Sequence, residues 1–397
     1  MGTPTITTAD RRARLAARHH LDPERAASSV LEASRSLVGF HGTDPTSVYL
    51  AAWSRVRGFR TAVLEEALYD ERSLLKILGM RRTMFVVPMD LAGVIQSACT
   101  DAIATGERTR LLRMIEEAGI AAPAEPWLAT VEAETVEALR GLGEATAADL
   151  TKVVEGLRAQ IPFGAGKKWQ GTVGVSTRLL FLLSAEGRII RGRPKGTLVS
   201  SLYRWAPMDR WINGSLTAHS KPEAQAELVR AYLETYGPAT TVDVKWWTGW
   251  TVAESKRALG AIGAVEVDLD DGQRGWVLAG DEDGATAASR SDPWIALLPA
   301  LDASIMGWQQ RDWFLEPYAP RLFDTNGNAG PTIWVDGRAV GGWAQRRSGE
   351  IRWELLEDVG AEATSLIEAK VATLGGWLGA LRFLPRFRTP LEQELSA

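Results

Sequence analysis

The sequence predicts an α+β fold in which three tandem winged-helix modules precede an antiparallel β domain. Short amphipathic helices followed by an extended stretch recur along the chain, and this is the order of elements in a winged helix. The pattern Gly-x-Ala-Thr-x-x-Asp-apolar occurs at 143–150 and again at 237–244, which indicates an internal repeat. From Ser291 onward the apolar residues alternate with a period of two, which is typical of strands.

The first predicted module covers residues 23–122. Its helices are expected over 23–38, 46–56 and 61–78, and its extended stretch over 82–87. Residues 1–22 are polar and rich in arginine, so we expect an N-terminal arm that becomes ordered only on contact.

The second predicted module covers residues 123–218. It begins with a helix over 127–142, and a second helix starts at Thr146, whose hydroxyl is a good N-cap. A third helix over 172–185 leads into a basic stretch at 187–196, which we interpret as the wing.

The third predicted module, 219–288, repeats this order. Helices are expected over 222–236, after the Thr240 cap and over 252–262, and a hairpin pairs 264–269 with 275–278. This third wing carries four carboxylates, Glu266, Asp268, Asp270 and Asp271. Because carboxylates repel phosphate, the second wing is the better candidate for contact with a nucleic-acid backbone.

The last predicted unit, 289–397, is a small antiparallel β domain. Strands are expected at 295–298, 332–335, 338–343 and 351–355. A helix over 361–374 and a basic tail follow.

Length and composition indicate a soluble protein of several parts. The chain has 397 residues, is 45% hydrophobic and contains no apolar run long enough to cross a bilayer. The single cysteine, Cys99, excludes a disulfide framework, and without an apolar N-terminal segment we expect a cytoplasmic protein. There are four histidines and no HExxH or CxxC motif, so we expect no metal and no other cofactor.

The net charge of −4 does not favour a general nucleic-acid binder, but the basic residues are clustered. In the second wing, four cations fall within eight residues that contain no acid. The candidate DNA-binding residues are Arg81, Arg82, Lys167, Lys168, Arg188, Arg191, Arg193 and Lys195. For each cluster, a solvated face is the alternative interpretation.

The stretch from Gly164 to Lys168 is similar to a phosphate-binding loop but lacks two of its residues. Ile161 stands where that motif requires glycine, and Lys168 replaces its serine or threonine. We interpret the stretch as a basic loop between helices.

The segment Gly39-Phe40-His41-Gly42-Thr43-Asp44-Pro45 is predicted to be a short corner between two helices. His41 and Thr43 flank a glycine, and their side chains could together hold one small group such as a water. The alternative for His41 is a helix-corner histidine with a structural role. Asp44 precedes a proline at the start of a helix, so a cap is favoured over a carboxylate that faces a cationic sugar.

Five segments are each weak signals alone, but their order and spacing along the chain are together specific for one protein family. They are 37–56, 79–88, 236–243, 297–302 and 331–338. In this combination the chain resembles the winged-helix DNA glycosylase family of AlkZ and YcaQ (AlkX), over nearly its whole length from about Glu24.

The resemblance implies a C-shaped, monomeric protein that acts on double-stranded DNA. Such proteins excise bulky N7-alkylated purines and unhook interstrand cross-links, and some protect the producers of DNA-alkylating antibiotics. The family signature is Gln-x-Gln or Gln-x-Asp at the corner that holds His41 and Thr43 here, and Phe85 stands where a histidine is common. The candidate catalytic residues are therefore His41, Thr43 and Asp44. Asp302, Trp308, Gln309 and Arg311 are expected to face the cleft.

The chemistry expected of a glycosylase needs little acid catalysis. An N7-alkylguanine is cationic and already a good leaving group, so the enzyme must stabilise an oxocarbenium ion and present a water. Neutral His41 would accept a proton from that water and Thr43 would orient it, so activity should fall as pH drops through the histidine pKa. Two rival hypotheses are a non-catalytic winged-helix DNA-binding or regulatory protein, and a protein that does not bind nucleic acid.

Overall fold

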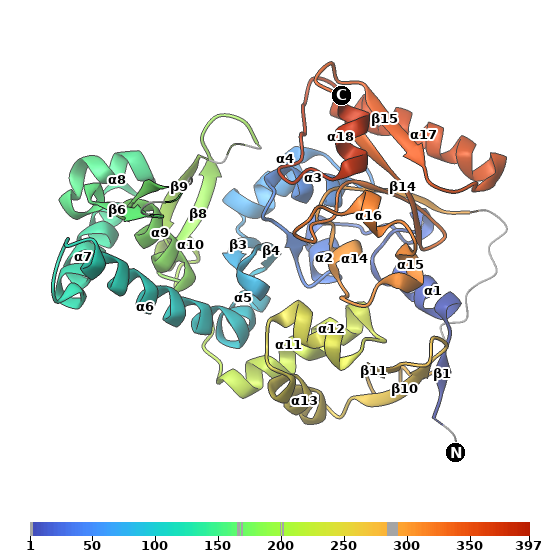
Figure 1. Cartoon of the computed structure of the whole chain (residues 1–397), viewed down its shortest axis with the longest axis horizontal. Coiled ribbons are helices and arrows are strands. Elements are labelled where there is room, and N and C mark those ends of the chain that lie inside the picture. Colours follow the sequence, from blue (N-terminus) through green and yellow to red (C-terminus); the bar gives the residue numbers. More distant parts are fainter. Residues whose placement is uncertain (1–2, 165–166, 168–169, 199, 201, 284–292) are drawn as a thin grey trace.

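The computed structural model describes residues 3–164, 167, 170–198, 200, 202–283 and 293–397. In these residues helices alternate with small sheets, so the predicted α+β class is confirmed. The described strands form one four-stranded sheet, three three-stranded sheets and one two-stranded sheet. In Figure 1 the elements between α7 and β9 form a lobe to one side of the remaining chain, and α6 leads into this lobe.

The first unit is built on the sheet β2-β4-β3. Its strands are β2 (Phe40–His41), β3 (Leu74–Leu78) and β4 (Met84–Pro88). Its helices are α2 (Val30–Arg35), α3 (Pro45–Trp53), α4 (Thr61–Glu65) and α5 (Met89–Ile95).

Two helix predictions in this unit are wrong. The helix expected over 23–38 is reduced to α2 and a short 3-10 turn at Pro23–Arg25. The helix expected over 61–78 ends in a π-helical turn at Glu66–Asp70, and its last part is the strand β3. All five residues of β3 are buried and pair with β4, so a non-local pairing outweighs the local helical pattern.

The corner that carries His41 also differs from the prediction, because it joins a strand to a helix. His41 is the last residue of β2 and lies opposite Phe85 of β4. Gly39 just before it has φ +106°, and a Cβ there would lie 2.6 Å from a side-chain carbon of Val87. Glycine at this position therefore allows β2 to approach β4.

The second unit contains the predicted helices, and a strand hairpin covers the stretch that was interpreted as a wing. Its elements are α7 (Ala124–Leu142), β5 (Ala145–Thr146), α8 (Ala147–Val153), α9 (Val175–Ala185), β8 (Ile189–Pro194) and β9 (Tyr203–Pro207). A hairpin of β6 (Gln160–Phe163) and β7 (Gly171–Gly174), followed after the wing by α10 (Met208–Trp211), was not predicted. Leu111 and Ile115 of α6 (Asp101–Glu117), which precede the expected boundary at 122, pack in the core of this unit.

In the third unit three helices again precede a strand hairpin. Its elements are α11 (Lys221–Tyr236), α12 (Thr241–Thr248), α13 (Val252–Ala261), β10 (Val265–Leu269) and β11 (Arg274–Val277). Thr240 and Asp243 form a capping box at α12, as Thr146 and Asp149 do at α8.

The expected N-terminal arm is instead part of this third unit. Strand β1 (Thr5–Ile6) pairs in parallel with β10, and α1 (Thr8–Arg18) contacts α11. Arg14 and Arg18 both bind the carboxylate of Asp281, each at 2.7 Å. The arginines that suggested a solvated arm therefore attach it to the fold.

The C-terminal unit contains the predicted antiparallel sheet, in the order β12-β13-β14-β15. The strands are β12 (Ile295–Leu298), β13 (Thr332–Val335), β14 (Arg338–Gln345) and β15 (Ile351–Leu355). The helices are α14 (Ala303–Met306), α15 (Asp312–Leu315), α16 (Ala319–Leu322), α17 (Gly360–Leu378) and α18 (Pro390–Ser396). The expected basic tail thus ends in a helix, and Leu391 of α18 is buried against Gly342 of β14.

Candidate functional site

The His41 ring lies in a nearly closed environment. The residue is only 7% exposed, and its ring meets the ring of Phe85 edge to face, with centroids 5.3 Å apart. The Nδ1 atom is buried and has no hydrogen-bond partner among the described residues. Nε2 is therefore the ring atom that is left to take a water.

Burial, and to a smaller extent the nearby positive charge of Arg81, lowers the pKa of His41 to about 3. The imidazole is therefore neutral at every ordinary pH. Such an imidazole is a weak proton acceptor but a good hydrogen-bond acceptor, so this geometry suits orienting a water better than deprotonating it.

Thr43 and Asp44 are held by different contacts. The partly exposed Thr43 accepts a hydrogen bond through Oγ1 from the backbone N–H of Met84 at 3.2 Å, which leaves its own proton available. Asp44 is buried, and its Oδ1 accepts from the N–H and hydroxyl of Thr46 at 3.0 and 2.7 Å. Its Oδ2 accepts from the N–H of Arg386 at 2.8 Å, so Asp44 caps α3 and joins the C-terminal tail to the corner.

Arg81 and Arg311 both lie against the indole of Trp246. Their guanidinium carbons are 3.8 and 5.0 Å from the centre of that ring. Burial lowers the pKa of Arg311 to about 10, and Arg81 contributes to this shift. Two neighbouring, partly buried cations repel each other. A phosphate bound between them would offset this repulsion.

Three of the predicted DNA-binding arginines are paired with acids, namely Arg82, Arg188 and Arg193. Arg188 lies 2.7 Å from Glu132 and 3.6 Å from Glu186, inside an ion-pair cluster of the second unit. Arg193 lies 3.1 Å from Glu65 of the first unit, so it connects the second wing to that unit. Lys167 is exposed, and Lys168 lies outside the described residues.

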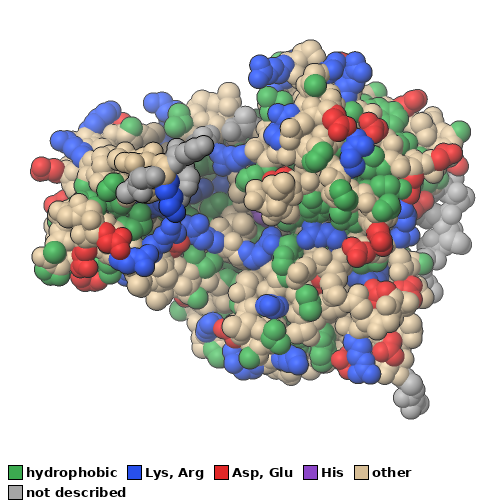
Figure 2. All heavy atoms as spheres, in the orientation of Figure 1, with side chains coloured by type: hydrophobic (Ala, Val, Ile, Leu, Met, Phe, Trp, Pro, Cys, Tyr) green, Lys and Arg blue, Asp and Glu red, His purple; other side chains and the backbone are tan. Residues whose placement is uncertain are grey.

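Arg82, Arg191 and Lys195 line one cavity. Arg191 lies over the rings of Tyr203 and Trp205 at 5.1 and 5.3 Å, whereas Arg82 pairs with Glu107 at 2.9 Å. In Figure 2, Lys and Arg side chains gather along the hollow between the second unit and the rest of the molecule.

The comparisons with known proteins agree with these features. The family model "DNA glycosylase AlkZ-like" matches residues 34–377, which is most of the chain. The chain belongs to the AlkZ-like DNA glycosylase family. Among solved structures, the Streptomyces sahachiroi DNA glycosylase AlkZ matches with a TM-score of 0.71 and 20% identity, covering 94% of this chain and 97% of that one. No curated protein sequence matches.

Two residues expected to face the cleft of this AlkZ-like glycosylase lie in its interior instead. Asp302 is 1% exposed and forms an ion pair with Arg55 at 2.6 Å, in which neither side chain is exposed. Trp308 is 3% exposed, and its indole N–H donates to the carbonyl of Tyr236 at 3.0 Å. Gln309 is exposed, and its backbone N–H donates to Asp243. The polar residue that looked functional in the sequence, Asp302, is thus the partner of a buried cation.

Sequence reasoning missed Lys76, which lies near the candidate site of the AlkZ-like fold. It is 7% exposed on β3, and its Nζ lies 4.8 Å from the ring centre of Tyr203. Burial, together with the positive charge of Arg191, lowers its pKa to about 7, although the negative charge of Asp44 opposes the shift. A single lysine inside the apolar run Leu-Leu-Lys-Ile-Leu was the available signal.

The described residues contain no group of three or more His, Cys, Asp or Glu side chains that could hold a metal. None of the helices in the same residues of this AlkZ-like chain is long and apolar enough to cross a membrane.

Proposed function

We propose that this glycosylase excises bulky N7-alkylated purines from double-stranded DNA, and unhooks cross-links made at the same atom. The observation that carries this proposal is the buried, neutral imidazole of His41 on the same short corner as the hydroxyl of Thr43. N7-alkylation gives the purine a positive charge, so the enzyme needs no strong acid to release it. A neutral group next to the sugar avoids the repulsion that an imidazolium would exert on an oxocarbenium ion.

The reaction is a hydrolysis. The bond between C1′ and N9 breaks, and its electron pair stays with the purine and neutralises the charge that alkylation created. A water oriented by Nε2 of His41 and Oγ1 of Thr43 adds its oxygen to C1′, and its proton passes to solvent. The products are the free alkylpurine and an abasic site. Asp44 holds the corner in place by capping α3 and binding the tail.

We also propose that the three helical units with their small sheets are winged-helix modules arranged as a C around one DNA duplex, in a monomer. The shared capping boxes of α8 and α12 support a common module, and the basic hollow in Figure 2 supports the place of the duplex. Arg81, Arg311, Arg191 and Lys195 would bind phosphates, because the described contacts of these four include no ion pair with an acid.

The direct test is release of free base from a duplex with one defined N7-alkylguanine, with N7-methylguanine and a bulky polycyclic adduct compared at the same site. We expect release of the bulky adduct at a single-turnover rate well above that of the spontaneous reaction. Binding of both duplexes without release of either base would instead favour a regulatory DNA-binding protein on this scaffold.

The pH profile should be flat over the ordinary range. Because burial lowers the pKa of His41 to about 3, the ring is neutral above about pH 4 and becomes protonated only below it. The sequence alone placed the fall in activity near the usual histidine pKa, and the structure moves the expected fall below pH 4. We expect single-turnover rate constants, measured with saturating enzyme, to change less than about threefold between pH 8 and pH 5. A fall centred near pH 6 that His41→Gln abolishes would contradict this.

A further inference from the structure

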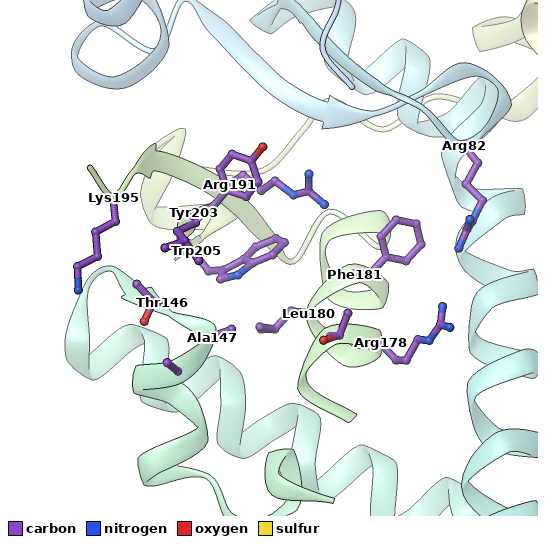
Figure 3. Close-up of a pocket in the computed structure, with 13 residues that line it drawn as sticks. Arg82, Thr146, Ala147, Arg178, Leu180, Phe181, Arg191, Lys195, Tyr203 and Trp205 are labelled. Carbon is purple, nitrogen blue, oxygen red and sulfur yellow. The ribbon is translucent and has the colours of Figure 1, made fainter. Parts of the chain in front are cut away.

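The cavity between the second wing and helix α9 has an apolar, aromatic interior and a cationic rim. Its volume is about 470 Å³, which is in the range of pockets that enclose small organic ligands. Figure 3 shows the rings of Tyr203, Trp205 and Phe181 beside the cavity, with Lys195 at one edge and Arg82 and Arg178 at the opposite one. Leu180 and Ala147 complete the apolar part.

The rim is positively charged, and of its cations Arg82 alone forms an ion pair among the described residues, with Glu107 outside the cavity. Four of its residues are cations, Arg82, Arg178, Arg191 and Lys195, and no carboxylate is among the described residues that line it. The Nε atoms of Arg178 and Arg191 are buried without a hydrogen-bond partner in the described structure. The outer nitrogens of these two guanidinium groups, rather than the buried Nε atoms, would donate to the acceptor oxygens of a ligand.

These two properties select the chemistry of the ligand. A flat ring system can stack on Tyr203 and Phe181, and an attached phosphate can accept from the arginines. A neutral aromatic group would leave Arg178, Arg191 and Lys195 without an anion. An anion without a ring would leave the aromatic wall in contact with water. A nucleotide has both parts.

The cavity is also close to the candidate catalytic corner. Arg82 on its rim directly follows Arg81 in the sequence, and the positive charge of Arg81 helps to lower the pKa of His41. Tyr203 in its wall contacts Lys76, which in turn interacts with Asp44. DNA that places a lesion at His41 would therefore pass the mouth of this cavity.

We propose that the cavity is a second nucleotide site, which receives one nucleotide of the bound DNA after it has left the base stack. The base lies among Tyr203, Trp205 and Phe181, and its two flanking phosphates are held at opposite edges of the cavity, one by Lys195 and the other by Arg178. By taking up this nucleotide, the site would hold the duplex open next to the lesion, which lets a bulky adduct reach the corner. This inference rests on the proposed function, because the second site can receive a nucleotide only if DNA binds in the same hollow.

Photo-crosslinking tests the site without any need for catalysis. A duplex with a tetrahydrofuran abasic analogue carries 5-iododeoxyuridine at one position at a time, in either strand, and is irradiated in complex with the full chain. Iodouracil crosslinks to aromatic rings on which it is stacked. We expect one position to crosslink to Tyr203, Trp205 or Phe181. Crosslinks only to residues outside the cavity, or none at any position, would overturn the proposal.

Binding by variants gives a second readout. Tyr203→Ala and Phe181→Ala should raise the Kd for this duplex by about 5- to 100-fold, because each removes a stacking surface. Tyr203→Phe keeps the ring and should bind as the wild type does. Arg178→Gln should lower the slope of log Kd against log salt by about 1, while Arg113→Gln, an exposed arginine of α6 outside the cavity, should leave it unchanged. Wild-type affinity in both alanine variants would contradict the proposal.

Two further outcomes separate related ideas. If the wild type releases alkylated base but gives no crosslink in the cavity, the second site is wrong and the proposed function stands. If the chain does not bind the duplex at all, both are wrong. Free deoxyadenosine 5′-monophosphate should not displace the duplex at concentrations at which an unlabelled duplex does. Displacement by the mononucleotide alone would reassign the cavity to free nucleotides.

Discussion

His41→Ala is expected to slow the release of an N7-alkylated base by about 10²-fold, while the affinity for the same duplex changes less than about threefold. The ring nitrogen that would orient the attacking water is lost, whereas the phosphate contacts proposed for Arg81 and Arg311 remain. The measurement is the single-turnover rate constant of base release with saturating enzyme, together with the Kd for a duplex that carries an abasic analogue.

Three comparisons show whether this effect arises from the reaction itself. His41→Gln restores the residue type that the family signature carries at this corner, and we expect it to keep activity within about tenfold of the wild type, because an amide oxygen also accepts from water. His219→Ala changes a partly exposed histidine, and it should change neither the rate of base release nor the affinity. Equal losses of rate and affinity in His41→Ala, or a large fall in its melting temperature, would point to a structural role of the buried ring.

Asp302→Ala is expected to lower the free energy of unfolding by about 3–5 kcal/mol. Both carboxylate oxygens bind the guanidinium of Arg55, at 2.9 and 2.6 Å, and neither side chain is exposed. Arg55 also donates to the carbonyl of His19 at 3.0 Å and to the hydroxyl of Ser304 at 2.9 Å. Without Asp302 the guanidinium would stay buried with its charge uncompensated. Chemical denaturation of the variant and the wild type measures the difference.

Two variants provide the controls for this pair. Asp90→Ala removes the partner of Arg35 in an ion pair whose side chains are 54% and 65% exposed, and such a pair contributes little to stability. Replacing both buried partners with apolar residues, as in Arg55→Met with Asp302→Leu, should cost less than Asp302→Ala alone, because no buried charge is left. If Asp302→Ala unfolds at the same denaturant concentration as the wild type, the pair does not have the proposed structural role.

The elements that the sequence predicted well are those stabilised by local interactions. Thr146 and Thr240 begin helices α8 and α12 as expected, because the capping hydrogen bonds join residues three apart. The Asp271-Gly272 hairpin and the strands of the C-terminal sheet also follow from local patterns of turn residues and alternating polarity. Asp44 before Pro45 caps α3 as its sequence indicates.

The predictions that were wrong depend on partners far away in the chain. Strand β3 looked helical until its pairing with β4 was known, and the N-terminal segment looked like a free arm until Asp281 appeared beside Arg14 and Arg18. Asp302 was expected in a cleft because its sequence neighbours do not reveal Arg55, which lies 247 residues earlier.

The sequence by itself thus determined where the capped helices and turns begin, and it placed His41 and Thr43 on one short corner. Only the tertiary structure decided the protonation of that histidine, the contacts of each arginine and the aromatic cavity beside the second wing. These properties depend on burial and on charges brought together from distant segments, and desolvation acts on a side chain only after the chain has folded around it.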